Sequence, residues 1–235
     1  MEGGTNLNLI IDGKKDIDFN FILENPIAMP VSEMNTAFTN VDGRDGSVHE
    51  DLGLQDITFS AVLNLFTFND VYNDVSKMVA ALFNAKEFTT DTWPFIFKKK
   101  HISWSEIANE MGVTAKIQIN VRCHPLKFLK NSPTQSFTAA GTVKNTGTYS
   151  SKPLLKLYAK GAGASSVTLN GTKFTMNMQK EYVFVDCELL DAYYTTTNMN
   201  RFMLGSFPTL KPGDNNLTFD GAIAKIEIEP RCCNL

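Results

Sequence analysis

The strongest constraint in this sequence is the run of short alternating segments in its second half. KPLLKLYAKG places Leu155 and Leu157 on the face opposite Lys156, which is the period-two pattern of a half-buried strand. SVTLNGTKFTMNM carries Asn170-Gly171 between two alternating arms, and Asn-Gly suits a type I′ turn because both residues tolerate positive φ. Strands that recur about every ten residues with turn residues between them predict an all-β sandwich.

The first half also contains alternating segments. NLNLIID, DIDFNFI and TAKIQINVRCHPL each alternate at period two and therefore predict strands. Their apolar faces would be formed by Leu7, Leu9 and Ile11, by Ile17, Phe19 and Phe21, and by Ala115, Ile117, Ile119 and Val121.

One segment of the first half has helical periodicity instead. FNDVYNDVSKMVAALFNAKEF predicts an amphipathic helix near residues 70–84, and Asn69 or Asp70 can cap its start. The residues that recur at helical spacing are Val71, Val75, Met78 and Leu82.

A connector divides the chain. Pro125 interrupts the last alternating run of the first half, and KFLKNSPTQSF after it has the composition of a linker. We therefore expect an N-terminal β domain over residues 1–135, with the helix near 70–84. Residues 136–235 would form the C-terminal sandwich.

Charge and composition limit the class of protein. The net charge is −3, whereas a dedicated nucleic-acid binder usually has a strongly basic face. Residues 1–60 carry 11 acidic and 3 basic side chains, a net of −8, and the remainder sums to +5; regions of opposite sign can meet across a subunit boundary. The start resembles no signal peptide, and no apolar run approaches the ~20 residues that span a bilayer.

The residues that carry chemistry are few and scattered. The three histidines are His49, His101 and His124, and no nucleophile elbow accompanies them. Cys123 and His124 could join Cys232 and Cys233 at a metal, but no spacing matches a zinc module. Four cysteines are also too few for a disulfide framework. We expect no catalytic residues, no cofactor and no metal.

A glycine-bracketed charged tip, Gly43-Arg44-Asp45-Gly46, interrupts the strand-like run of residues 35–66. Glycines allow positive φ at low steric cost, and the charged residues between them favour water. A calcium loop counted from Asp42 fails because Arg44 stands where an acidic ligand is needed. Two interpretations remain at this point: a plain β-turn, or the tip of a projecting arm that another chain contacts.

Carbohydrate binding is the other function to consider, because sugar rings stack on exposed aromatic side chains. Both tryptophans, Trp93 and Trp104, lie in the first half, which leaves Tyr193 and Tyr194 as the platform in the C-terminal sandwich. A cell-wall carbohydrate-binding module that uses this sandwich is therefore the alternative function.

The order of these features resembles the distal tail proteins of siphovirus-type bacteriophages. The segments that carry the resemblance include NTGTYSSKPLLKLYAKGAGASSVTLNGTKF, EYVFVDCELLDAYY, NMNRFMLGSFPTLKPGDNNLTFDG and KIEIEPRCCNL. GRDG and INVRCHPLKF correspond in the first half. An aromatic residue commonly follows the Pro-Arg ending of that family, and Cys232 stands there in this chain.

The resemblance implies a mainly β chain: an N-terminal β-sandwich or split barrel with one α-helix that assembles as a hexameric ring, and a C-terminal galectin-like β-sandwich. The resemblance also allows the last ~10 residues to pack back on the N-terminal domain, but it does not decide this. Gly43, Arg44, Asp45 and Gly46 would belong to an arm that contacts neighbouring subunits.

The implied role is structural. The ring would be a hub at the virion tail tip, with a central channel for DNA, assembled in the host cytoplasm. Its partners would be further copies of itself, the major tail-tube protein, a tail-tip or tail-associated protein and a receptor-binding protein, with no sequence-specific nucleic acid and no membrane. A phage-derived bacteriocin or prophage particle would use the same protein in the same way.

Overall fold

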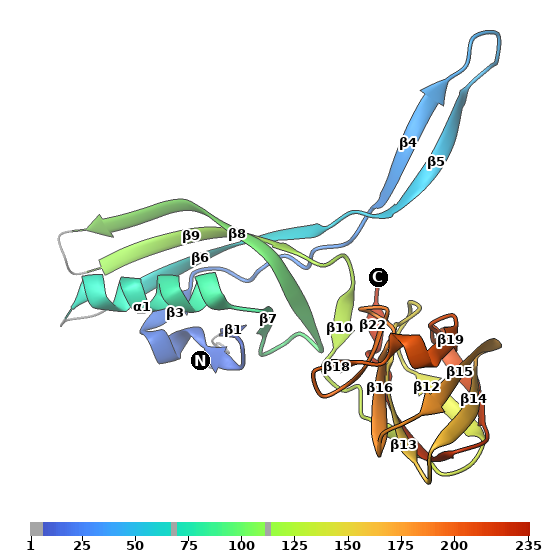
Figure 1. Ribbon diagram of the computed structural model, residues 1–235. Helices are drawn as coiled ribbons and strands as arrows, with labels where there is room; N and C mark the ends of the chain where they lie inside the picture. Colours follow the sequence, from blue (N-terminus) through green and yellow to red (C-terminus); the bar gives the residue numbers. More distant parts are fainter. Residues whose placement is uncertain (1–6, 67–69, 111–113) are drawn as a thin grey trace. The chain divides into compact units, whose positions relative to one another are not determined.

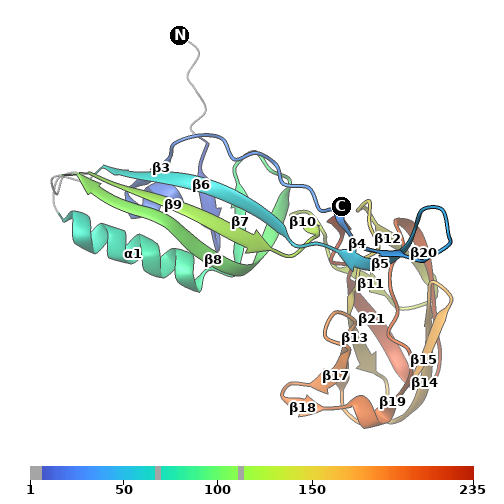
Figure 2. The same ribbon diagram turned by 90° about the horizontal axis from the view of Figure 1, so that it is seen from above.

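The computed structural model describes residues 7–66, 70–110 and 114–235. They form two compact units, one of residues up to Lys127 and one of Phe128–Asn234, and each is described by itself. This division falls before the predicted boundary near residue 135. The described chain is mainly β, and α1 (Val71–Asn84) is its one α-helix (Figures 1 and 2). No helix in the described part is long and apolar enough to span a membrane.

The N-terminal unit is built on a curled sheet with the strand order β2-β1-β7-β8-β9-β6-β3. A separate two-stranded sheet, β4 with β5, extends from it. The bounds are β1 Leu9–Ile11, β2 Lys14–Lys15, β3 Phe21–Leu23, β4 Met34–Asn40, β5 Ser47–Leu54, β6 Ile57–Phe66, β7 Glu87–Thr90, β8 Phe95–Glu110 and β9 Thr114–Cys123, with β10 Lys127–Leu129 at the division.

The long strand β8 makes this sheet a split barrel. Its first residues pair with β7, where Phe97 lies opposite Phe88, and its later residues pair with β9. The register shifts twice along the β8–β9 ladder, between Lys99 and His101 and again beyond Trp104. Such bulges bend a strand and increase its twist, which lets one strand serve both halves of the sheet.

The helix closes this barrel. Asp70 caps it, since its side chain accepts a hydrogen bond from the backbone N–H of Asn73, so the predicted cap at Asp70 is confirmed; Asn69 lies outside the described residues. Met78 and Leu82 are fully buried, and α1 lies along one face of β6, β9 and β8 in both views (Figures 1 and 2). The predicted apolar face of residues 115–121 is buried as well.

The predicted strand over DIDFNFI is wrong in its first half. Asp16–Phe19 forms a 3-10 helix, and β3 begins only at Phe21. Buried Asp16 accepts hydrogen bonds from the backbone N–H groups of Ile17 and Leu23, and Asn20 has φ +63°. Asp and Asn side chains stabilise such turns through local backbone contacts, so Ile17 is exposed and does not join the apolar face.

The C-terminal unit is a two-sheet β-sandwich. One sheet has the order β11-β21-β13-β16-β17-β18 and the other β12-β20-β14-β15-β19. The bounds are β11 Gln135–Phe137, β12 Gly141–Asn145, β13 Leu154–Ala159, β14 Gly163–Leu169, β15 Thr172–Met178, β16 Tyr182–Asp186, β17 Asp191–Tyr194, β18 Thr197–Asn198, β19 Met203–Gly205, β20 Gly213–Phe219, β21 Ile223–Glu229 and β22 Cys233–Asn234, with a 3-10 turn, η2, at Asn200–Phe202.

The sequence patterns of this half are confirmed. Leu155 and Leu157 are fully buried between the sheets. Asn170 (φ +52°) and Gly171 (φ +81°) form the turn of the β14–β15 hairpin, with Leu169 opposite Thr172. Positive φ at both central residues is the geometry that favours Asn-Gly.

Candidate functional site

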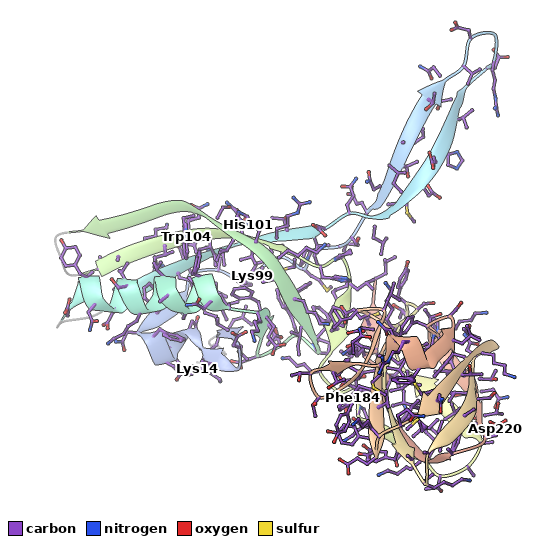
Figure 3. All side chains as sticks on the ribbon, viewed as in Figure 1. Lys14, Lys99, His101, Trp104, Phe184 and Asp220 are labelled. Carbon is purple, nitrogen blue, oxygen red and sulfur yellow. The ribbon has the colours of Figure 1, made fainter. Side chains whose placement is uncertain are left out.

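The β4–β5 hairpin, called the arm below, is the most unusual surface of the N-terminal unit. Its strands pair with each other in the register Phe38–His49 and Asn40–Ser47, and the described strands include no further partner for either. Nearly every arm side chain is exposed, and Figure 3 shows them standing clear along both strands.

The predicted charged tip is the turn of this arm. Gly43 has φ +80° and Gly46 has φ +77°, and the backbone N–H of Arg44 donates to the Val41 carbonyl oxygen. Glycine adopts such φ values without steric cost. The structure therefore brings Gly43, Arg44, Asp45 and Gly46 together at the end of a projecting hairpin.

The arm exposes apolar side chains on both of its faces. Phe38 is 71% exposed, and it pairs with His49 across the ladder. Val48 and Leu52 lie on the other face of β5, because successive strand residues alternate, and Leu52 is 57% exposed. An isolated two-stranded hairpin is marginal in water, and these side chains would gain stability by burial against another surface.

Polar contacts hold the base of the arm. The Ser32 hydroxyl donates to the Gln55 carbonyl oxygen, and the backbone N–H of Gln55 donates to the Glu33 carbonyl oxygen. Asp56, the next residue, pairs with Lys100 of β8 and Arg122 of β9. The hydrogen bond from Lys100 holds the pKa of Asp56 below its usual value, against an opposing effect of burial.

A polar hollow of about 450 Å³ lies at this base, at the start of β6. Its lining residues are Asn35, Leu54, Gln55, Asp56, Thr58 and Arg122.

The outward face of the main sheet is polar and nearly neutral. Ser60 of β6 donates to the side-chain oxygen of Asn120 on β9, and Gln118 lies on the same face as Asn120 because their strand positions differ by two. The cations at its ends are paired, Lys116 with Glu24 and Arg122 with Asp56.

The histidines do not form a cluster. His49 lies on the arm, His101 on β8, and His124 follows β9, where its Nδ1 accepts from the backbone N–H of Leu126. The four cysteines are buried, and none of them forms a disulfide. Burial raises the pKa of Cys123 and of Cys187 to about 12, so both stay protonated, and the thiol is a poor nucleophile. Within the described ranges, no group of His, Cys, Asp and Glu side chains is arranged to hold a metal ion.

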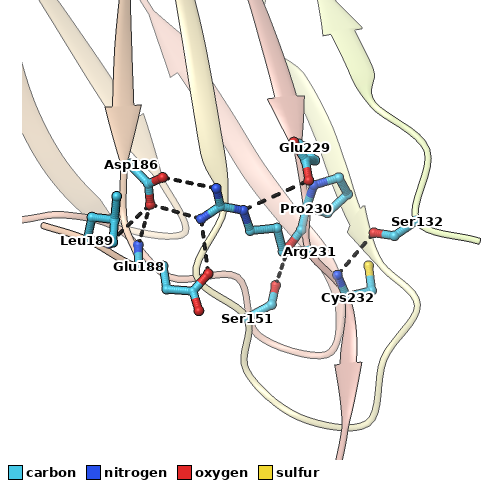
Figure 4. A network of polar contacts seen from close by, with 9 residues as sticks. All are labelled: Ser132, Ser151, Asp186, Glu188, Leu189, Glu229, Pro230, Arg231 and Cys232. Carbon is cyan, nitrogen blue, oxygen red and sulfur yellow. Dashed lines mark hydrogen bonds and ion pairs between the residues drawn. The ribbon is translucent and has the colours of Figure 1, made fainter. Parts of the chain in front are cut away.

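A buried ion pair fixes the end of the C-terminal unit (Figure 4). Arg231 donates to both carboxylate oxygens of Asp186, at 2.8 and 2.9 Å, and to Glu188 at 3.2 Å. Asp186 also accepts from the backbone N–H groups of Glu188 and Leu189. Of the segment beyond Arg231, residues 232–234 belong to this unit, where the Tyr149 N–H donates to the Cys233 carbonyl oxygen. Leu235 is grouped with the N-terminal unit.

Sequence reasoning located the arm tip but missed the two most exposed large apolar side chains of the arm, Phe38 and Leu52. Phe38 is the one large apolar residue of NTAFTN, and Leu52 lies between Asp51 and Gly53 in SVHEDLGL. The available signal was an isolated large apolar residue in a polar alternating run, which is unusual for a strand with no buried face.

The fold and the arm together define a class of protein: the chain has the fold of the phage tail hub and baseplate proteins. No family model matches the sequence, and no curated protein is significantly similar to it.

The structure of the SPP1 Dit (gp 19.1) protein, described as a paradigm of the hub adsorption apparatus in phages that infect Gram-positive bacteria, is similar with a TM-score of 0.66. It is 17% identical, and the match covers 95% of this chain and 98% of that one. Two structures of the phage p2 baseplate in its activated conformation, with Sr and with Ca, match at TM-scores of 0.57 and 0.51. Both are 10% identical and cover 94% of this chain and 96% of theirs. The resemblance to the siphovirus-type distal tail proteins is thus confirmed at the level of the fold.

Proposed function

We propose that this protein is a structural hub at the tail tip of a bacteriophage of the siphovirus type. Copies of the chain assemble as a hexameric ring through the N-terminal domain, residues 1–135. The ring joins the tail-tube protein on one side to a tail-tip or tail-associated protein on the other. The C-terminal domain, residues 136–235, is a galectin-like sandwich that presents docking surfaces to a receptor-binding protein.

The observation that carries this proposal is the arm. In the protomer, Phe38 is 71% and Leu52 57% exposed, on a hairpin that pairs with no other strand of the described residues. In a ring with cyclic symmetry each arm lies on the next subunit, and the ring closes without a free end. The apolar side chains of every arm are then covered. The acidic N-terminal sixty residues, at −8 against +5 for the remainder, favour the same head-to-tail contact.

The polar face of the main sheet fits the wall of a channel for DNA. Proteins hold DNA chiefly by cations that neutralise phosphates. On this face Lys116 is paired with Glu24 and Arg122 with Asp56, and neutral Ser60, Gln118 and Asn120 lie between them. Such a wall presents a hydrated polar surface to DNA and contains no strong binding site for its phosphates. No catalysis is part of the proposed role.

The solution mass tests the ring. We expect a particle of about six times the 26.1 kDa chain mass by multi-angle light scattering, with a hollow six-fold outline in negative-stain images. A chain that stays at 26.1 kDa at every accessible concentration, and also when mixed with its tail-tube partner, contradicts the proposal.

Valine substitutions at the arm tip test whether ring formation depends on the arm. In the doubly substituted variant Gly43→Val and Gly46→Val, the tip turn loses two positive-φ positions, at +80° and +77°, that a β-branched residue adopts only with strain. Apart from the adjacent residues of the chain, no atom lies within 4 Å of the added Cβ positions, so any effect comes from the turn itself. We expect a smaller share of rings at equal protein concentration, and an unchanged share would remove the arm tip from the proposal.

A further inference from the structure

The solvent-facing side of one sandwich sheet carries a continuous aromatic surface, called the aromatic strip below. It crosses β13, β16 and β17, where the inward positions are buried and aliphatic and the half-buried outward positions carry aromatic side chains beside Leu154 and Lys156. Tyr194 follows outward-facing Tyr193 at the end of β17 and packs in part against the sandwich core. Its members are Tyr158, Tyr182, Phe184, Tyr193 and Tyr194. Figure 3 labels Phe184, which is near the middle of the strip.

The rings of the strip contact one another in sequence across the strands. Tyr158 and Tyr182 lie 6.4 Å apart between ring centroids, and Tyr182 lies 5.6 Å from Phe184 and 4.9 Å from Tyr194. Tyr193 stacks on Phe184 at 5.3 Å with 28° between the ring planes. Ring pairs at these separations hold each other in place, so the strip is a rigid platform.

Hydrogen-bonding groups are interleaved with these rings. The ammonium group of Lys156 lies 4.8, 4.5 and 5.3 Å from the ring centroids of Tyr158, Tyr182 and Phe184. The Tyr158 hydroxyl donates to Glu227 at 2.7 Å, and the Tyr194 hydroxyl donates to Glu181 at 3.0 Å. Each carboxylate keeps further lone pairs, and Lys156 keeps further N–H groups, for a ligand.

A hollow adjoins one end of the strip, where β13 ends at Ala159 and β16 begins at Tyr182. It has a volume of about 250 Å³ and is lined by Ala159, Gly161, Ala162, Gln179, Lys180 and Glu181. Sites for drug-sized ligands are larger, at about 300–1,000 Å³. The hollow therefore suits one small polar unit of a longer ligand that continues over the rings.

We propose that the aromatic strip binds an extended neutral oligosaccharide. The apolar C–H face of a sugar stacks on Tyr193, while its hydroxyl groups donate to Glu181 and Glu227 and accept from Lys156. One sugar unit at the chain end occupies the hollow beside Glu181. This site is independent of ring formation, and it gives the tail tip a contact of its own with a glycan-covered surface.

The chemistry of the strip favours a sugar over a protein partner. Protein interfaces bury about 800 Å² per partner around large apolar anchors. Within the described part of this unit, the large exposed hydrophobic residues lie on turns or on edge strand β19: they are Tyr149, Leu189, Leu190 and Leu204. Leu189 and Leu190 stand in the turn between β16 and β17, at the end of the strip. The strip itself consists of rings and hydrogen-bonding groups, and a polyhydroxylated ring complements both.

Binding of the full chain to a glycan array, followed by calorimetry with the oligosaccharides that it captures, tests the site. Tyr193→Ala should weaken binding about tenfold or more, that is by about 1.4 kcal/mol or more. Tyr193→Phe keeps the ring and should stay within about threefold, that is below 0.7 kcal/mol. Tyr72→Ala is the matched control, because Tyr72 is a tyrosine 73% exposed on α1 of the other unit.

Each outcome decides the proposal. Loss of binding in Tyr193→Ala with retention in Tyr193→Phe and Tyr72→Ala supports it, provided that thermal unfolding of the three variants matches. An array on which no glycan is captured overturns it, as does binding that Tyr193→Ala leaves unchanged. If Tyr193→Ala abolishes capture of a receptor-binding protein while no glycan binds, the strip is a protein interface and the sugar proposal is wrong. None of these outcomes depends on whether the chain forms a ring.

Discussion

Replacing Arg231 by alanine is expected to lower the free energy of unfolding of the C-terminal unit by about 3 kcal/mol. Asp186 is 4% exposed and Arg231 17%, and removal of one partner from a buried pair costs about 3–5 kcal/mol because the other charge stays behind. Asp186 retains the N–H groups of Glu188 and Leu189, which places the expected cost at the lower end. Arg231→Lys should retain only part of the stability that Arg231→Ala loses, since lysine cannot form the two parallel hydrogen bonds.

The measurement of stability has to distinguish unfolding of the C-terminal unit from unfolding of the N-terminal unit. Both tryptophans, Trp93 and Trp104, belong to the N-terminal unit, so tryptophan fluorescence follows that unit and should not change. Hydrogen exchange at the amides of β13, β16 and β21 follows the sandwich and should accelerate by about two orders of magnitude, the equivalent of 3 kcal/mol.

Arg201 provides the matched control for this substitution. It is an exposed arginine of the same unit that lies 4.6 Å over the Phe202 ring. Arg201→Ala should cost no more than about 1 kcal/mol. Equal exchange rates in Arg231→Ala and Arg201→Ala would show that the network of Figure 4 adds no stability.

The same network makes the stability of the sandwich depend on pH. Burial raises the pKa of Asp186, but the hydrogen bond from Arg231, the N–H groups of Leu189 and Glu188 and the Arg231 charge outweigh it, so the folded pKa is lowered. A lowered carboxyl pKa adds stability above the unfolded value of about 3.9, and that stability is lost as the pH falls toward the folded value. The stability difference between wild type and Arg231→Ala should therefore be full at pH 7 and shrink below about pH 4. A difference that stays constant down to pH 2 would contradict this assignment.

The parts of the fold that were predictable are those encoded by neighbouring residues. Alternation around Leu155 and Leu157, the Asn170-Gly171 turn and the helical spacing through Met78 and Leu82 all depend on local period or local φ. The prediction of a strand over DIDFNFI was wrong because a contact to a residue outside this segment determines the conformation of its first half. The Asp16 carboxylate reaches the N–H of Leu23, and alternation contains no information on such a hydrogen bond.

The candidate surfaces were less predictable for the same reason. Gly43 and Gly46 reveal a turn in the sequence, but only the structure shows that no other strand covers the arm. The aromatic strip joins Tyr158, Tyr182 and Tyr193 from separate strands, and cross-strand register is set by turn lengths and packing rather than by residue pattern. Sequence analysis named Tyr193 and Tyr194 alone.

Removing the apolar side chains of the arm is expected to dissociate the ring into protomers. The doubly substituted variant Phe38→Ser and Leu52→Ser deletes one large side chain from each face of the hairpin, 71% and 57% exposed in the protomer. Full burial of such a side chain contributes about 1.5–3 kcal/mol, so each contact between neighbours loses about 3–6 kcal/mol. That loss weakens every contact about 10² to 10⁴-fold.

The protomer itself should be unaffected, because an exposed side chain makes few contacts to lose. Light scattering should then give 26.1 kDa at concentrations where the wild type is a ring, with the tryptophan signal of the N-terminal unit unchanged. Thr36→Ser with Thr39→Ser is the matched control: it trims two side chains of the same strand, β4, removes little apolar area, and should leave the ring intact. Rings that survive in Phe38→Ser with Leu52→Ser would show that the arm projects for a partner other than a second copy of this chain, since closure of a ring places one arm in every contact.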